Sequence, residues 1–329
     1  MTTPAPLEWQ PVILGLLGGL GLFLYGLGQM SEALQAVAGK RAERVLARLT
    51  TNRFAGVATG TIATVVLDSS STTIILVIGL VTAGLLSFPR ALPIVLGANV
   101  GTTFSSLIVA LNVTEYAPLA LLAGVLMRAI AKGERWKRYG SVLLALGLVF
   151  FGLELIGQAT TPLQDHPPFL RLLERLEHPS LAILAGAGAT AVIQSSSAMM
   201  GIVITFALQG VCTLSVGVGL MMGAELGTCL DTLVASVGRS RAALRTGVFQ
   251  IMFNVANVLL WMAFTDQLAA LATRLADDVP KQLAYAHIIF NVSGVLVALP
   301  FTNLLARALE RMVPEPGGSR LRGAVPAAT

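Results

Sequence analysis

Charged residues are scarce in this chain. Asp, Glu, Lys and Arg make up 12% of its 329 residues, whereas hydrophobic residues make up 55% and the mean hydropathy is +0.78. This balance differs from that of an ordinary soluble domain and predicts an integral membrane protein. The formal net charge of +5 indicates no nucleic-acid partner, because the basic residues fall in segments where membrane topology accounts for them.

Cysteine and histidine are also rare, with two and three residues respectively. Cys212 and Cys229 have no metal-ligand spacing, so we expect them to pack as small apolar residues in helices. His166 and His178 fall in a predicted outer loop, and His287 has no evident serine and acid around it. An intramembrane serine hydrolase is therefore the weaker interpretation, and we expect neither an enzyme nor a bound cofactor.

Long apolar stretches are plentiful instead. A helix needs about 20 apolar residues to cross roughly 30 Å of hydrocarbon. The first apolar stretch follows no basic residue and precedes no cleavage site, so we expect it to remain in the mature protein. Two longer apolar regions, residues 54–86 and 180–212, are interrupted by polar residues. Seven further stretches are candidate spanning helices: residues 11–38, 88–111, 116–131, 139–160, 214–237, 246–265 and 284–306.

Lys and Arg cluster in the segments between these stretches. The clusters are at residues 40–53, 128–138 and 239–245 and in the C-terminal tail. The positive-inside rule places them in the cytoplasm, and the loops around 112–117, 161–179 and 266–283 outside. These assignments agree if each interrupted region crosses the membrane an even number of times. We therefore predict a multi-pass protein of the cell inner (plasma) membrane, with its N-terminus outside and its C-terminus in the cytoplasm.

The two interrupted regions belong to an internal repeat. An offset of 126 residues takes Ser69, Ser70 and Ser71 to Ser195, Ser196 and Ser197. The same offset aligns "LGLFLYGL" with "LGLVFFGL" and "GANVGTT", residues 97–103, with "GAELGTC". The register holds without a gap from residue 20 to about residue 107. A chance match would not persist over this length, so the chain contains two related halves.

The repeat predicts an all-α membrane protein built from two inverted halves. Each half would comprise a spanning helix, a re-entrant hairpin that turns back at the serines, and a second spanning helix. An odd number of spanning helices separates equivalent positions, which inverts the second half. Broken helices in inverted repeats are typical of secondary transporters, and the breaks mark the binding site. The expected segments are repeat 1 at 11–111 with hairpin 54–86, a linking helix and cytoplasmic loop at 112–138, repeat 2 at 139–237 with hairpin 180–212, C-terminal transmembrane helices at 238–312 and a disordered tail at 313–329.

The polar residues at the hairpin tips predict a paired site for an anion and a cation. The start of a helix presents free N–H groups and the positive end of its dipole, which suits a phosphate-like oxyanion. Amide, carboxylate and carbonyl oxygens suit a hard cation such as sodium. The expected phosphate ligands are Ser69, Ser70, Ser71, Ser195, Ser196 and Ser197. The expected sodium ligands are Asp68, Gln194, Asn99, Thr102, Thr103, Glu225, Thr228 and Asp231.

Structural roles for these residues remain open at this point. Serines in membrane helices often bond to their own helix or to a neighbour. Asp68, Glu225 and Asp231 could be paired with a nearby arginine such as Arg239. His287 in "HIIFN" and Gln250 in "QIMFN" share a pattern that packing of polar residues between helices also explains.

The motifs resemble those of the type II sodium/phosphate cotransporters, whose hallmark is QSSS in each of two inverted repeats, followed by a GANIGTT-like motif. Residues 194–197 match QSSS fully, and residues 68–71 differ at Asp68. "GANVGTT" is nearly identical to the second motif, and "GAELGT" differs at Glu225. The resemblance implies sodium-driven symport of inorganic phosphate, with both serine regions contributing to the phosphate and sodium sites.

The two acidic departures add negative charge near the expected anion site. We interpret Asp68 and Glu225 as cation ligands or as groups that exchange protons during an alternating-access cycle. The alternatives are a transporter or channel for another oxyanion, and a phosphate exporter. The expected partners are phosphate, sodium and the lipid bilayer, with no nucleic acid, and a homodimer is one assembly that the sequence allows.

Overall fold

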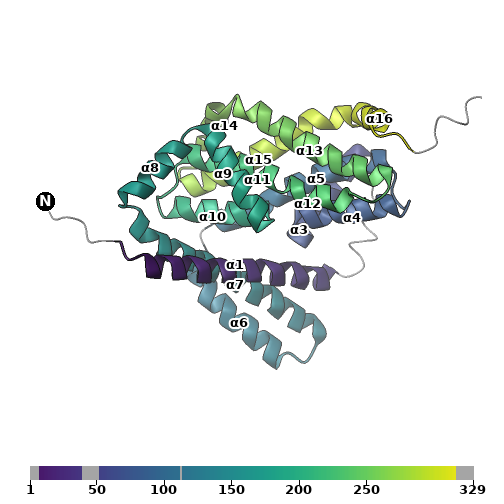
Figure 1. The fold of residues 1–329 in the computed structure, drawn as a ribbon. Coiled ribbons are helices and arrows are strands. Elements are labelled where there is room, and N and C mark those ends of the chain that lie inside the picture. The colour runs from purple at the N-terminus through teal and green to yellow at the C-terminus, as the bar shows by residue number, and fades with distance from the viewer. Residues whose placement is uncertain (1–6, 39–51, 112, 316–329) are drawn as a thin grey trace, which may run out of the picture.

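The computed structural model describes residues 7–38, 52–111 and 113–315 (Figure 1). Within these ranges every regular element is helical. Most of the basic cluster at 40–53 and residues 316–329 of the expected disordered tail lie outside the described residues. The start of that tail contacts α13, because Arg245 donates to the Val313 carbonyl and pairs with Glu315.

Within the described ranges, six segments are long and apolar enough to cross a membrane. A seventh is obtained if α8 (Pro167–Leu176) and α9 (Pro179–Ile193), which are bent by 106° relative to each other, are counted as one span. The chain is thus an all-helical membrane protein. The six segments are α1 (Trp9–Ala38), α5 (Phe88–Ala110), α7 (Glu134–Thr160) with η2 (Thr161–Leu163), α11 (Leu214–Gly227) with α12 (Cys229–Ser236), α13 (Arg241–Met262), and α15 (Val279–Ala298) with η3 (Leu299–Phe301) and α16 (Thr302–Met312).

Two expected spanning helices differ in the structure. The stretch at 116–131 forms η1 (Thr114–Tyr116) and α6 (Ala117–Ile130), and the 14 residues of α6 extend only about 21 Å. This is shorter than the hydrocarbon layer, so α6 does not meet the length requirement. The stretch at 284–306 is divided at η3, where Pro300 lacks the N–H that a continuous helix would use. A short helix, α14 (Thr265–Thr273), fills part of the preceding loop.

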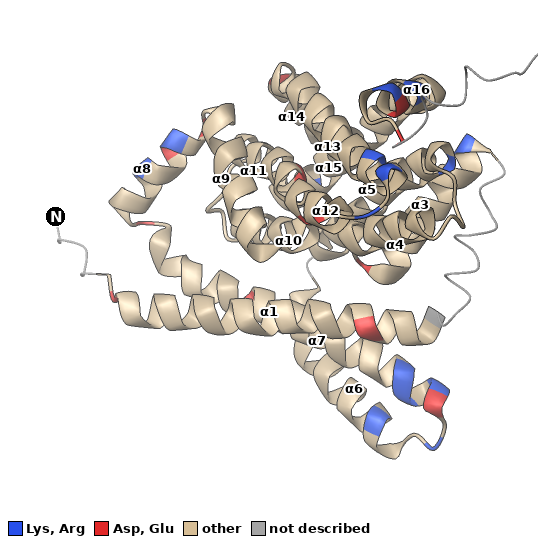
Figure 2. Cartoon of the chain, turned by 45° about the vertical axis from the view of Figure 1, so that its right-hand side comes forward, with Lys and Arg blue, Asp and Glu red and all other residues tan. Residues whose placement is uncertain are grey.

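Charged side chains lie mainly toward the ends of the molecule. Figure 2 shows Lys and Arg on α16 and around the connection between α6 and α7 on the right, and on α8 at the left. Long uncharged helix segments lie between them, as a spanning arrangement requires.

Several helices of the two halves begin and end at equivalent residues of the internal repeat. The offset of 126 residues takes α3 (Arg53–Leu67) onto α9 and α4 (Ser70–Thr82) onto α10 (Ser196–Leu208) at both ends. It also takes the start of α5 onto the start of α11 and the end of α5 onto the end of α12. Gly84 and Gly210, which follow α4 and α10, both adopt positive φ angles, 71° and 68°. The two halves therefore share one local fold.

Glycines set the direction in which α3 and α5 pack. Gly56 lies against Pro93, Gly60 against Ile94 and Gly101 against Thr64. A Cβ atom on Gly60 would fall 2.0 Å from the Ile94 carbonyl oxygen, so only glycine allows this approach. Because the contacts advance in the same direction along both helices, α3 and α5 are parallel. The intervening α4 must therefore return toward the level at which α3 begins.

The second half repeats this packing, and its first helix is reversed. Gly186 lies against the Leu220 carbonyl just as Gly60 lies against Ile94. The equivalent helices α1 and α7 run antiparallel, since Gly15 contacts Ala159 while Gly26 contacts Val149. The antiparallel pair agrees with the reversed orientation expected of the two halves.

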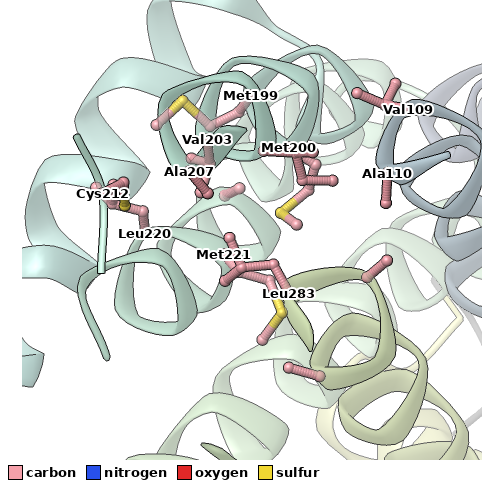
Figure 3. Close-up of a cluster of buried hydrophobic side chains, with 14 of the residues drawn as sticks. Val109, Ala110, Met199, Met200, Val203, Ala207, Cys212, Leu220, Met221 and Leu283 are labelled. Atoms are coloured by element: carbon pink, nitrogen blue, oxygen red, sulfur yellow. The ribbon is translucent and has the colours of Figure 1, made fainter. Parts of the chain in front are cut away.

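Two apolar clusters hold the hairpin helices in place. Figure 3 shows part of the larger one, in which Met199 and Met200 of α10 pack near Met221 of α11 and Leu283 of α15. The smaller cluster joins α4 and α5 to α13 and α16 through residues such as Ile78, Leu92 and Phe249. Both short helices that follow the serines are thus anchored in apolar cores.

Candidate functional site

In each half of the chain, a helix ends at an equivalent residue, and a second helix begins shortly after it. Asp68 ends α3 with φ 49°, and Gln194 ends α9 with φ 60°. Among the described residues these are the only non-glycine residues with positive φ. The left-handed conformation costs such residues roughly 1–2 kcal/mol. Its occurrence at the two symmetry-related breaks makes both residues candidates for a functional role.

The first serine of each triplet caps the helix that follows. The Ser69 Oγ atom accepts from the Thr72 N–H at 3.1 Å, and the Ser195 Oγ atom accepts from the Ala198 N–H at 3.1 Å. Both residues have extended backbones, as helix caps do. The oxygen is used in each case, and the hydroxyl hydrogen can still donate to a ligand.

The other serines leave donors available at the breaks. Ser70, Ser196 and Ser197 are buried, yet among the described residues their hydroxyls form no hydrogen bond. The N–H groups at the start of α4 and α10 have no acceptor within their own helices. In both Figure 1 and Figure 2, α10, α12 and α4 lie at a similar height in the molecule, with α12 between the other two. Each break therefore offers backbone and hydroxyl donors, as an oxyanion site requires.

The first break also collects two carboxylates. Ser105 of α5 donates to the Asp68 carboxylate, and Asp231 of α12 lies near Ser71 of α4, with these two helices in contact. Ser105 and Asp231 are equivalent residues of the two halves under the offset of 126. One acid thus comes from each half. The second break has the exposed Gln194 at the position of Asp68.

The second break has an unsatisfied hydroxyl that the first lacks. In the first half, Thr64 donates to Thr73 at 3.0 Å across the break. In the second half, Thr190 is fully buried, and its hydroxyl has no partner among the described residues. The reason is that Met199 occupies the position of Thr73, so the two breaks are related in backbone and different in chemistry.

The motifs of α5 and α11 lie against the C-terminal helices. The side-chain amides of Asn99 and Gln250 exchange two hydrogen bonds, at 3.0 and 2.9 Å. At the equivalent position, Glu225 Oε1 lies 3.0 Å from His287 Nε2. His287 Nδ1 lies 2.8 Å from the Ser106 hydroxyl. Since a carboxylate only accepts, Nε2 donates to Glu225.

These positions divide the expected sodium ligands into two groups. Asp68 and Asp231 lie at the first break. Asn99 and Glu225 are 1% and 2% exposed and are paired within helix interfaces. The hydroxyls of the threonines donate to carbonyls of their own helices: Thr102 to Asn99, Thr103 to Val100 and Thr228 to Glu225.

Two site residues are not among those expected from the sequence. Ser105 was not singled out, although the offset aligns it with Asp231. His287 packs as a polar residue between helices, which is one of the roles left open above, and it is the partner of Glu225 in place of an arginine such as Arg239. The shared patterns "QIMFN" and "HIIFN" were the available signal, because Gln250 and His287 face equivalent residues of the two halves.

Known proteins resemble this chain over both halves. The family model described as Na+/Pi-cotransporter matches it twice, at residues 22–158 and 166–302. The protein YqeW of Bacillus subtilis, which has no characterised function, is 30% identical over 80% of this chain and 86% of its own length. No solved structure is significantly similar to the chain.

Two further relatives have names that refer to phosphate. YjbB of Escherichia coli K12, whose name proposes inorganic phosphate export, is 28% identical over 84% of this chain, and this chain spans about half of YjbB. The human sodium-dependent phosphate transport protein 2B is 39% identical over 29% of this chain and 14% of its own length. The doubled family match covers most of the sequence and both broken helices. This chain therefore belongs to the Na+/Pi-cotransporter family, a family of transporters and not of enzymes.

Proposed function

We propose that this protein is a secondary transporter that moves inorganic phosphate together with sodium by alternating access. The observation that carries the proposal is the pair of equivalent helix breaks, at Asp68 and Gln194, each followed by an N-terminal helix turn rich in serine.

Phosphate would bind between the two breaks. The free N–H groups at the starts of α4 and α10, together with the serine hydroxyls, provide donors from both halves. Ser70, Ser196 and Ser197 have hydroxyls without another partner among the described residues, so they can donate without breaking a bond. Ser69 and Ser195 would add donors while keeping their capping bonds, because their oxygens are the acceptors there, whereas Ser71 would have to turn its hydroxyl from Asp231 to phosphate.

Sodium would bind next to the phosphate at the first break. Asp68 and Asp231 supply carboxylate oxygens, and a cation between them would offset the negative charge that phosphate otherwise meets. Gln194 would provide an amide oxygen from the second break. The remaining proposed ligands, Asn99, Thr102, Thr103, Glu225 and Thr228, would have to exchange present hydrogen bonds for the ion.

The membrane arrangement is part of the proposal. The parallel packing of α3 with α5, and of α9 with α11, supports two re-entrant hairpins that enter from opposite sides. The antiparallel α1 and α7 support inverted halves. The basic residues on α16 and near the α6–α7 connection (Figure 2) support a cytoplasmic location for that end, with the N-terminus outside and the C-terminus inside.

Phosphate export is the second candidate. The similarity to YjbB covers 84% of this chain, whereas the similarity to the human sodium-dependent protein covers 29%. The direction of net phosphate flux and its coupling to sodium are separate properties. The same site can carry phosphate inward or outward when the driving gradient is reversed.

The test is uptake of radiolabelled phosphate into proteoliposomes. An inward sodium gradient is compared with an equal potassium gradient, and unlabelled sulfate is the competitor. Sodium-dependent accumulation that sulfate does not reduce is expected. Equal phosphate flux in both salts would remove sodium from the proposal, and the absence of flux in either direction would remove phosphate.

The serine assignment needs its own variants. Ser196→Ala with Ser197→Ala is expected to abolish phosphate transport without changing the amount of folded protein. Ser141→Ala is the matched control, since its hydroxyl bonds only to a carbonyl of its own helix, α7. Unchanged transport in the double variant would contradict the assigned role of these serines.

A further inference from the structure

A pocket lies away from the helix breaks, where four helix ends meet. The starts of α3, α5 and α16 and the end of α15 enclose about 710 Å³. This volume is in the range of small-molecule sites, roughly 300–1,000 Å³. We call it the Arg53–Arg90 pocket after the two arginines that line it. Its other lining residues include Asn52, Phe54, Leu296 and Asn303.

The polar wall of this pocket is positively charged. Arg53 and Arg90 line it, and none of the described residues that line it is acidic. The Arg53 guanidinium donates to the carbonyls of Leu299 and Pro300, at 3.4 and 3.1 Å, which fixes its position. Arg90 is exposed and, among the described residues, forms no hydrogen bond or ion pair through its side chain. Two guanidinium groups with unused donors favour a phosphate or carboxylate ligand.

The helix starts around the pocket add to this charge. The residues that precede α5 and α16, Ser87 and Phe301, provide no side-chain cap for the first N–H groups of those helices. The positive ends of two helix dipoles thus lie on the same side as the arginines, and the N–H groups of Arg90 and Thr302 themselves donate to the Ser87 and Leu299 carbonyls. The charge of this wall is therefore complementary to that of an anion.

The other wall of the pocket is apolar and open. Phe54 of α3 is 71% exposed, and Leu296 of α15 is 63% exposed. In a membrane protein, large apolar side chains with this exposure contact acyl chains. The ligand that matches both walls has an anionic head and a hydrocarbon tail.

The depth of the pocket in the membrane agrees with such a ligand. The candidate span of α5 begins at Phe88, next to Arg90. The end of a span lies at the level of the lipid headgroups. Basic pockets between helices at this level bind anionic headgroups.

We propose that the Arg53–Arg90 pocket binds an anionic phospholipid, with its phosphate on the two arginines and an acyl chain along Phe54 and Leu296. The lipid would join the first residue of α3, which starts the first hairpin, to α5 and α16. The pocket is separate from the proposed transport site, so its occupancy would tune stability and transport without being part of the substrate path.

Lipid binding is tested on the full chain purified in a neutral detergent. The melting temperature is followed by intrinsic fluorescence during titration with phosphatidylglycerol, phosphatidylcholine or inorganic phosphate. Phosphatidylglycerol is expected to raise the melting temperature at concentrations at least tenfold lower than phosphatidylcholine requires. Stabilisation by phosphate alone that is lost with Arg90→Gln would show a free-anion site and would overturn the lipid assignment.

Variants identify the pocket as the source of the effect. Arg53→Gln with Arg90→Gln is expected to weaken the phosphatidylglycerol effect at least tenfold. Arg241→Gln with Arg311→Gln removes two exposed charges that do not line the pocket, and is expected to leave it unchanged. Equal losses in the two double variants would indicate unspecific attraction and contradict the proposal. If the first double variant does not fold, Arg90→Gln alone gives the test, because Arg90 makes no side-chain bond within the described residues.

Discussion

Removal of the His287 imidazole should destabilise the protein through two neighbours at once. His287 is fully buried and bonds with Glu225 on one side and Ser106 on the other. In His287→Ala, both groups lose their partner in a site that water does not reach. Each unsatisfied buried group costs about 1–3 kcal/mol, so the expected loss is about 2–6 kcal/mol. This is a large part of the roughly 5–15 kcal/mol by which folded proteins are stable.

The first half supplies the matched control. Asn99 and Gln250 form the equivalent contact with amides alone, so Glu225→Asn with His287→Gln copies that pair into the second half. Each single substitution leaves one original partner facing a new residue. The double variant restores a complementary pair, made of two amides as in the first half. The two substitutions should therefore couple favourably by about 0.5–3 kcal/mol, as contacting residues do.

The assay is equilibrium unfolding of the detergent-solubilised protein by an anionic detergent, followed by tryptophan fluorescence. The free energies of unfolding of the two single variants and the double variant form a cycle. A double-variant loss equal to the sum of the single losses would refute the contact between Glu225 and His287. A loss below about 1 kcal/mol in His287→Ala would refute its role as a buried bridge.

Three further predictions concern the packing of α3 on α5, the first break and a helix cap. Gly60→Ala should destabilise the protein strongly, while Gly79→Ala, whose Cβ meets nothing within 4 Å, should not; comparable melting temperatures would contradict the packing of α3 on α5. Asp68→Gln should keep phosphate transport and change its dependence on sodium concentration, which a sodium titration of uptake measures. Asp278→Ala should cost about 1 kcal/mol, because Asp278 caps α15. Partial burial raises the pKa of Asp278, but hydrogen bonds from Lys281 lower it further, to below its ordinary value. The stability it provides should therefore be present at neutral pH and be lost as the pH falls through that lowered pKa, and acid titration of the unfolding midpoint should show a smaller change in the variant.

Much of the architecture could be predicted from the sequence because the repeat carries local information twice. The offset that aligns the serines also places the ends of α3, α4, α9 and α10, since each end is set by local signals. The bounds of α6 agree with the expected stretch at 116–131 to within one residue at each end. Its expected role as a spanning helix differs, because a stretch of that length is shorter than the about 20 residues that a crossing needs.

The candidate site could be predicted only in part. Asp68 and Gln194 are marked by their place in a repeated motif. The partners of Glu225 and Asp231 come from helices far along the chain, with His287 62 residues from Glu225. Such pairings depend on how helices pack, and packing has no local signature. The repeated pattern around Gln250 and His287 indicated a shared role without revealing what either residue contacts.

The glycine contacts between α3 and α5, and between α9 and α11, restrict how this protein can move. A carbonyl that lies where a Cβ would be, as at Gly60 and Gly186, leaves no room for one helix to slide past the other. Each pair should therefore move as one rigid body. In the proposed alternating-access cycle, the rearrangement that opens the breaks to either side would occur at softer contacts, such as the methionine-lined interface of α10 with α11 and α15 (Figure 3). Flexible side chains there can repack as helices shift.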